Sequence, residues 1–282
     1  MHVDVNGGRL WFDVDGPGLV PSGRDMRLRP TVVLVHGGPG SFDHSYFKPA
    51  FDELTAYAQV VYLDLRGHGR SEWGDAATWT FERCADDIRV FCDTVGIVDP
   101  IVLGHSMGGP CVLLYGARHP GHAAGLIVQS GFARWDAFRL VAAFRRAGGE
   151  TLADLAARSF DGEPVSEEED ALVFAAFGPR IPDNEQLARA PRNSDLNTHG
   201  MRLITRLDIL DQLARIKSRT LVHVGELDPV TPVGAAQEII ERLPPGIGRL
   251  EVLSDAGHFV WLDAPDRYWP VIIDFVTSCS RS

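Results

Sequence analysis

Short stretches rich in valine, leucine and isoleucine recur along the chain, and each predicts a strand of a sheet. The clearest is residues 31–35, an uninterrupted apolar run typical of a strand that is buried on both faces. Near the N-terminus the pattern alternates instead, over residues 10–14 after the turn Asn6-Gly7-Gly8, which predicts part of a hairpin. The other predicted strands are residues 59–63, 101–103, 126–128, 220–224 and 249–253.

Between these stretches apolar residues recur at helical spacing, which predicts helices. The clearest helix begins at Thr80 and stops at Gly96, a residue type that favours helix ends. Further helices are predicted at residues 43–57, 107–118, 233–243 and 265–279, and residues 19–30 are predicted to be a polar connection. Because strands and helices alternate, the predicted fold class is α/β, with a mostly parallel sheet covered by helices on both faces.

The alternation stops between about Phe132 and Asp211. This stretch has no strand-like apolar run, but it has several amphipathic segments, one of which opens with a capping box at Ser166 and Glu169. We therefore predict a helical lid at residues 132–211, inserted after the sixth strand into a core domain formed by residues 1–131 and 212–282.

The aromatic residues of the predicted lid allow two interpretations. They could line an apolar pocket for a substrate, or they could pack the lid against the core, and the sequence leaves both open. They are Phe132, Trp135, Phe138, Phe144, Phe160, Phe174 and Phe177.

Composition and charge exclude several classes of function. The 282 residues are 45% hydrophobic and 23% charged, as in ordinary globular proteins. The formal net charge of -11 repels phosphate backbones and anionic lipids, so we expect neither nucleic acid nor a membrane as a partner. No apolar run reaches the roughly 18 residues that span a bilayer, and the first residues lack a signal-peptide pattern. We expect a cytoplasmic protein with a small-molecule substrate, and the oligomeric state is not predicted.

The four cysteines, at positions 84, 92, 111 and 279, form no C-x-x-C pair and no cluster with histidines. Cys84 and Cys92 are eight positions apart on the predicted helix, which separates them by about 12 Å along its axis, too far for a disulfide. We therefore expect reduced, mostly buried thiols, and no metal or cofactor site is predicted.

Two glycine-containing segments that follow predicted strands carry candidate chemistry. Ser106 lies in Gly104-His105-Ser106-Met107-Gly108, a G-x-S-x-G pattern in which a serine occupies a sharp strand-to-helix turn and its small neighbours make room for it. The segment His36-Gly37-Gly38-Pro39-Gly40 follows residues 31–35 and offers backbone N–H groups that could stabilise an oxyanion. The sequence thus predicts a nucleophile and an anion hole.

A serine nucleophile requires a histidine base and an acid that orients the base. Asp228 follows the strand at 220–224, and His258 follows the last strand, so both should lie at the same sheet edge as Ser106. Glu226 or Asp255 could be the acid instead, and Asp228 could merely cap the next helix. The chain order serine, aspartate, histidine is that of the α/β-hydrolase fold.

Three other polar residues near these motifs have structural interpretations. His105 is predicted to be a neighbour packed under the serine turn, and His68 and Arg66 are predicted to organise their own loop.

Nearly all of the chain outside the lid resembles the α/β-hydrolase superfamily, and His36-Gly37-Gly38-Pro39-Gly40 is similar to the motif of its proline iminopeptidase branch. This resemblance implies an oxyanion hole made by the backbone N–H groups of Gly38 and Met107, with His36 as a residue that builds the loop. Where that branch tends to have glutamine and tryptophan, this chain has Leu65 and Met107. Proline iminopeptidases also have a tryptophan-rich segment that helps to hold the amino group of the substrate, and residues 198–211 of this chain lack it.

The sequence therefore predicts a serine hydrolase that cleaves a small carboxylic ester, lactone or amide through an acyl-enzyme on Ser106, without a cofactor. The alternatives are a proline iminopeptidase-type aminopeptidase, a carbon–carbon bond hydrolase or hydroxynitrile lyase-like enzyme on the same three residues, and a ligand-binding protein on a hydrolase scaffold.

Overall fold

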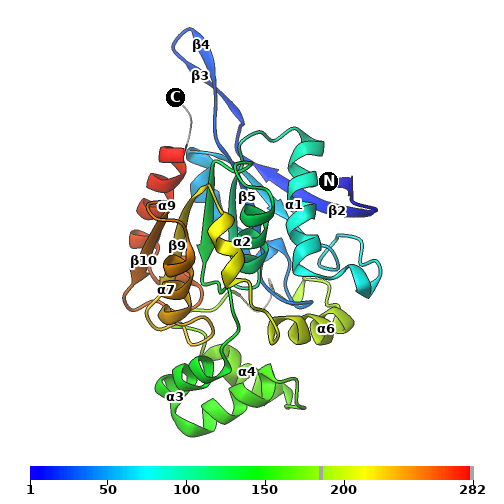
Figure 1. The fold of residues 1–282 in the computed structure, drawn as a ribbon, viewed down its shortest axis with the longest axis vertical. Coiled ribbons are helices and arrows are strands. Elements are labelled where there is room, and N and C mark those ends of the chain that lie inside the picture. The colour runs from blue at the N-terminus through cyan, green and yellow to red at the C-terminus, as the bar shows by residue number, and fades with distance from the viewer. Residues whose placement is uncertain (184–186, 280–282) are drawn as a thin grey trace.

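The computed structural model describes residues 1–183 and 187–279. Its centre is a mostly parallel sheet of eight strands (Figure 1). The spatial order is β1-β2-β6-β5-β7-β8-β9-β10. β1 and β2 pair antiparallel, β2 is antiparallel to β6, and all pairs from β6 to β10 are parallel. The strands are β1 (His2–Val5), β2 (Gly8–Asp15), β5 (Thr31–Val35), β6 (Gln59–Leu63), β7 (Ile101–His105), β8 (Gly125–Gln129), β9 (Arg219–Gly225) and β10 (Gly248–Leu253).

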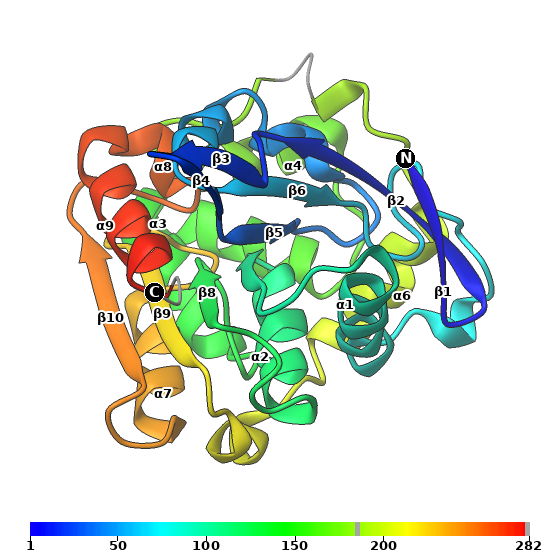
Figure 2. The ribbon, with the colours of Figure 1, turned by 90° about the horizontal axis from the view of Figure 1, so that it is seen from above.

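Helices cover both faces of this sheet (Figure 2). On one face α1 (Phe81–Val95), α2 (Gly108–Arg118) and α7 (Val233–Arg242) contribute to the same core cluster as Val33 and Val35 of β5. On the other face η2 (Ala50–Ala56), α8 (Val260–Asp263) and α9 (Pro265–Cys279) contribute to the same core cluster as Val32 and Leu34. Successive residues of a strand point to opposite faces, so an uninterrupted apolar run is what a sheet with two covers requires. The predicted fold class is confirmed.

The ends of α1 follow the predicted signals. The Thr80 side chain accepts a hydrogen bond from the Arg83 N–H at the first turn, and Gly96 takes the left-handed conformation, with φ 77°, after the last one.

The single helix predicted at residues 43–57 is wrong. The chain forms two short 3-10 helices there, η1 (His44–Phe47) and η2, separated by Lys48 and Pro49. Proline has no N–H to continue a helix, and its ring forces the preceding residue into an extended conformation, which Lys48 adopts with ψ 146°. A third short 3-10 helix, η3 (Ala76–Thr78), precedes α1.

The polar connection predicted between the N-terminal hairpin and β5 is also wrong. It is a second hairpin, β3 (Leu19–Ser22) and β4 (Asp25–Leu28). The hairpin projects from the end of the molecule opposite α3 (Ala137–Phe160) and α4 (Glu167–Ala175) (Figure 1). Leu19 pairs with Leu28, and these side chains remain 49% and 77% exposed. The hairpin has no buried face, so its sequence lacks the apolar run by which the other strands were predicted.

Between β8 and β9 lie the helices of the stretch predicted as a lid. They are α3 (Ala137–Phe160), α4 (Glu167–Ala175) and α6 (Ser194–Ile204), followed by η4 (Leu210–Arg215). The capping box of Ser166 and Glu169 is present at the start of α4. The predicted lid boundary at residue 211 falls within η4, whose buried Leu210 and Leu213 belong to the core. Within the described ranges, no helix is both long and apolar enough to cross a membrane.

Candidate active site

Ser106 occupies a strained turn between β7 and α2. Its φ of 53° lies in the left-handed region, which residues other than glycine rarely adopt. Hydrogen bonds hold the turn, because the Ser106 N–H donates to Gln129 O at 3.0 Å and the Gly109 N–H donates to Ser106 O at 2.9 Å. This is the local geometry that the G-x-S-x-G pattern predicts for an exposed nucleophile.

The glycines beside Ser106 are required by close approach of the backbone. A Cβ atom at Gly104 would lie 2.2 Å from Gly108 O, and one at Gly108 would lie 2.4 Å from Val35 O. The strand, the helix and the neighbouring β5 can therefore meet at the turn only if both residues lack a side chain.

The loop after β5 and the start of α2 present the predicted oxyanion donors. The Gly37 N–H donates to Tyr46 Oη at 2.7 Å, whereas the N–H groups of Gly38 and Met107 donate to no other group within residues 1–183 and 187–279. Met107 precedes the first residue of α2, where the helix dipole also favours an anion. Both N–H groups are thus available to a ligand.

Asp228 and His258 form a buried hydrogen-bonded pair. The Nδ1–H of His258 donates to Asp228 Oδ2 at 2.9 Å, and each residue is only 2% exposed. Asp228 Oδ1 also accepts the N–H groups of Val230 and Thr231, both at 2.9 Å, and Thr231 Oγ1 donates to Oδ2 at 2.7 Å. Burial alone would raise the pKa of Asp228, but the His258 charge and these hydrogen bonds hold it below its ordinary value.

The other two candidate acids do not contact the histidine. Glu226 and Asp255 are exposed, and neither is a hydrogen-bond partner of His258 among the described residues. Ser106 Oγ makes no hydrogen bond within the described part of the chain, as is common in active sites without substrate, where the catalytic hydrogen bond tightens only on binding.

His105 packs beneath the serine turn, as predicted. Its Nδ1 pairs with Tyr46 Oη at 2.8 Å and its Nε2 with His258 O at 3.1 Å. Burial, together with the neighbouring His258, holds the pKa of His105 well below its ordinary value, so this ring is neutral. It therefore links the serine turn to the His258 loop without being a base.

Residues that follow α4 contact the His258 loop, and the sequence had no signal for these contacts. The His258 N–H donates to Phe177 O at 2.7 Å, and the Phe177 ring meets the His258 ring edge-on at a centroid distance of 5.4 Å. The carboxylate of Asp263 accepts the N–H groups of Gly257 and Arg180, both at 2.7 Å. The segment after α4 is therefore fastened to the loop that carries the proposed base.

The sequence profile of the alpha/beta hydrolase fold matches residues 30–265. This chain belongs to the α/β hydrolase family. It is 26% identical to a monoacylglycerol lipase of Mycolicibacterium smegmatis, over 97% of this chain and 93% of that protein. It is 26% identical to 3-oxoadipate enol-lactonase 1 of Acinetobacter baylyi, over 99% of this chain and 97% of that protein. It is 25% identical to a proline iminopeptidase of Heyndrickxia coagulans, over 98% of both chains.

A solved structure of similar fold is a proline iminopeptidase of Mycobacterium smegmatis, with a TM-score of 0.78, 20% identity and coverage of 99% of this chain and 98% of that one. The names of the three sequence relatives agree on hydrolysis and differ in the bond that is cleaved. The family therefore indicates a hydrolase.

In this hydrolase, most aromatic residues of the stretch predicted as a lid pack against other side chains, whereas Phe138 is 91% exposed. Phe144 is fully buried in a small cluster within the lid. Phe174 instead packs on Phe42, which follows the oxyanion loop, at a centroid distance of 6.2 Å, and on Phe177 at 5.1 Å. An aromatic wall therefore extends from the oxyanion loop to His258.

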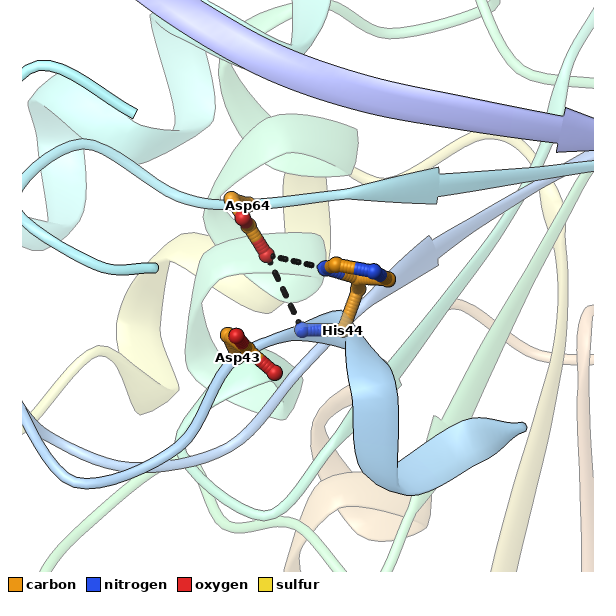
Figure 3. Close-up of side chains that lie close together, drawn as sticks. All are labelled: Asp43, His44 and Asp64. Carbon is orange, nitrogen blue, oxygen red and sulfur yellow. Dashed lines mark hydrogen bonds and ion pairs between the residues drawn. The ribbon is translucent and has the colours of Figure 1, made fainter. Parts of the chain in front are cut away.

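A second buried polar cluster lies beside the oxyanion loop (Figure 3). Asp43, His44 and Asp64 bring ligand-type atoms within 4.8 Å of one another. The Asp64 carboxylate is already hydrogen-bonded within the protein. Its Oδ1 accepts both the N–H and the Nδ1–H of His44, at 2.9 and 2.7 Å, and its Oδ2 accepts the Arg70 N–H at 2.9 Å. We interpret the cluster as a support for the loop at residues 64–71.

The two residues predicted to organise that loop do so. Arg66 pairs with Asp87 of α1, with Nε at 2.8 Å from Oδ2, and its Nη2 donates to Val5 O at 3.0 Å. His68 Nδ1 donates to Arg66 O at 3.0 Å. The other ring nitrogen, Nε2, is so close to Gly38 that a Cβ atom added to this glycine would lie only 3.2 Å from it. His68 thereby packs directly against the oxyanion loop.

Proposed function

We propose that this α/β hydrolase is a serine hydrolase that cleaves a small carboxylic ester, lactone or amide through an acyl-enzyme on Ser106, without a cofactor. The observation that carries the proposal is the buried Asp228–His258 pair, which lies at the same sheet edge as the strained Ser106 turn. A buried carboxylate that holds Nδ1–H leaves Nε2 of the imidazole free to act as a base.

In the first half-reaction Ser106 Oγ attacks the substrate carbonyl carbon while His258 Nε2 takes the Oγ proton. The carbonyl oxygen becomes an oxyanion, which accepts hydrogen bonds from the Gly38 and Met107 N–H groups. His258 then gives its proton to the leaving oxygen or nitrogen, the bond to that atom breaks, and an acyl-enzyme remains.

In the second half-reaction His258 takes a proton from a water molecule whose oxygen attacks the acyl carbon. The second tetrahedral intermediate collapses, the bond to Oγ breaks, and His258 returns the proton to Oγ. The carboxylic acid leaves and the enzyme is regenerated. Asp228 keeps the proton on Nδ1 and stabilises the imidazolium in both steps.

The aromatic side chains between the oxyanion loop and His258 support a proposal for the polarity of the substrate. The aromatic wall of Phe42, Phe174 and Phe177 favours an uncharged, apolar acyl or alcohol group near Ser106. A lipase and a lactonase among the relatives support ester or lactone substrates. Proline iminopeptidase-type activity is the second candidate, favoured by the His36–Gly40 motif and by the relative of that name.

The test combines labelling and turnover. We expect a fluorophosphonate to label Ser106, and we expect Ser106→Ala to lower turnover of aryl esters or lactones by about 10⁴-fold or more, because the nucleophile is lost. Ser278→Ala, at an exposed position on α9, is the matched control and should leave both unchanged.

Each other outcome has a defined meaning. Full turnover by Ser106→Ala contradicts the mechanism, and absence of an adduct on Ser106 favours a ligand-binding protein. Cleavage of prolyl amides far above esters identifies the aminopeptidase. Product analysis separates ester hydrolysis from carbon–carbon cleavage or hydroxynitrile lysis.

A further inference from the structure

The helix α6 is hydrogen-bonded to the oxyanion loop, although the two segments are far apart in the sequence. The N–H of Asn193, the residue that caps α6, donates to Gly40 O at 2.8 Å. One turn later Asn197 Nδ2 donates to Pro39 O at 3.0 Å and to Ser41 Oγ at 3.3 Å, across 158 and 156 positions of sequence. Three hydrogen bonds thus join α6 to residues 39–41.

This contact is also close-packed. A Cβ atom at Gly40 would lie 2.3 Å from Asn193 O, and one at Gly200 would lie 2.4 Å from Pro39 Cβ. Asn193, Asn197 and Gly200 are spaced by four and three residues, so they lie on one face of α6. That face leaves no room between the helix and the loop.

Asn193 connects the oxyanion loop to the loop on its other side. Its Nδ2 donates to Gly67 O at 3.0 Å, its Oδ1 accepts the Leu196 N–H at 3.1 Å, and the residue is buried. Gly67 directly precedes His68, whose ring packs against Gly38. The loop of Gly38 therefore packs against the loop of His68, and both loops are hydrogen-bonded to the start of α6.

We infer that α6 is a positioning element for the oxyanion hole, with Asn193, Asn197 and Gly200 as positioning residues that set the direction of the Gly38 N–H. This inference rests on the proposed function of Gly38. An oxyanion donor stabilises the transition state only when it lies about 2.7–3.1 Å from the developing charge. A small shift of residues 37–41 therefore lowers kcat, while substrate binding elsewhere in the site, and hence KM, changes little.

Two variants displace the loop by different means. Gly200→Ala adds one methyl group against Pro39 and improves the intrinsic helix propensity of α6, so any loss of activity comes from the wedge and not from a weaker helix. Asn197→Asp keeps the size of the side chain but replaces the donor with a carboxylate that faces the Pro39 carbonyl oxygen. Thr198→Ala, at an exposed position of the same helix, is the matched control.

We expect each of the two variants to lower kcat by about 10- to 100-fold, less than the 10²- to 10³-fold cost of removing a donor. KM should stay within about two-fold, and inhibition by a boronic acid, which mimics the tetrahedral oxyanion, should weaken in parallel with kcat. Amide hydrogen exchange at Gly37, Gly38, Gly40 and Ser41 should become faster in both variants, and Thr198→Ala should match the wild type in every measurement.

The controls separate this inference from the proposed function. If the wild type is labelled on Ser106 and both variants keep the wild-type kcat, the inference is overturned and the proposed function stands. If the wild type is not labelled, the proposed function fails, and unchanged exchange at the same four backbone amides in the variants would also overturn the contact role of α6. Should Gly200→Ala fail to fold, Asn197→Asp decides the question by the same readouts.

Discussion

At the scale of single residues, burial disfavours a positive charge on several imidazoles. An imidazole shielded from water is costly to protonate, so burial keeps the pKa of His105 well below its ordinary value and lowers those of His68 and His223 to about 3. These three rings are neutral near physiological pH. His258, in contrast, has the carboxylate of Asp228 as a partner that stabilises a positive charge.

His223 provides a test of this reasoning away from the proposed chemistry. It is fully buried on β9, and its ring meets the Tyr268 ring edge-on at a centroid distance of 5.2 Å. Its folded pKa, about 3, lies below the ordinary 6.5, so between these values the unfolded chain binds the proton and the folded one does not. The contribution of His223 to the free energy of unfolding should therefore fall by about 1.4 kcal/mol per pH unit as the pH drops below 6.5.

We expect His223→Leu to remove this contribution. Urea unfolding of the wild type and the variant should be measured from pH 7.5 to 4.5. Below pH 6.5 the free energy of unfolding should depend less steeply on pH in the variant, by a slope that corresponds to one bound proton. Parallel stability curves would show that His223 does not control this part of the pH dependence.

At the scale of elements, both loops of the proposed site are hydrogen-bonded to the stretch between β8 and β9. Asp263 at the end of α8 is the clearest case, because its two carboxylate oxygens accept the Gly257 N–H of the His258 loop and the Arg180 N–H that follows α4. The Arg180 side chain makes a separate bond, from Nη1 to Leu262 O at 2.9 Å. The carboxylate and the guanidinium can thus be tested independently.

We expect Asp263→Ala to lower kcat/KM by about 10- to 100-fold, because the Gly257 N–H loses its acceptor and the base shifts with its loop. The free energy of unfolding should fall by about 1–2 kcal/mol in denaturant titrations. Arg180→Ala retains the backbone N–H and is the matched control, expected to stay near wild-type activity. Equal losses in both variants would assign the effect to the guanidinium instead.

At the scale of the whole molecule, the projecting hairpin lies at the opposite end from the helices α3 and α4 (Figure 1). β3 and β4 pair only with each other within the described chain, and the strand pairing ends at Gly18 O, which accepts the Arg29 N–H at 2.9 Å. The hairpin can therefore be removed without separating the ends that it joins.

We expect a variant in which Asn-Gly replaces residues 19–28 to fold and to keep turnover within about two-fold, because two residues suffice to close an antiparallel pair. Thermal unfolding and steady-state kinetics check this. The excision also removes the exposed Leu19, Met26 and Leu28, so light scattering should show no greater association than in the wild type. A large loss of activity would reveal a role of the hairpin in the site.

Local patterns were sufficient for much of this architecture. Apolar runs predicted the central strands, and Thr80 and Gly96 predicted both ends of α1, because each signal is contained within a few neighbouring residues. The helix at residues 43–57 failed where Pro49 interrupts it, and the β3–β4 hairpin was missed because it packs on no core. That 132–211 is a separate lid stays a prediction, as does the assignment of Ser106, Asp228, His258, Gly38 and Met107.

The sequence by itself determined the α/β architecture, the strained serine turn and the chain order of the proposed catalytic residues, since each depends on residues that are close in the chain. Only the tertiary structure decided that Asp228, and not Glu226 or Asp255, meets His258. It also placed Asn197 against Pro39 and Phe177 against His258. Such contacts join segments 30 to 158 positions apart, and no local pattern of apolar and polar residues encodes which distant backbone groups will meet.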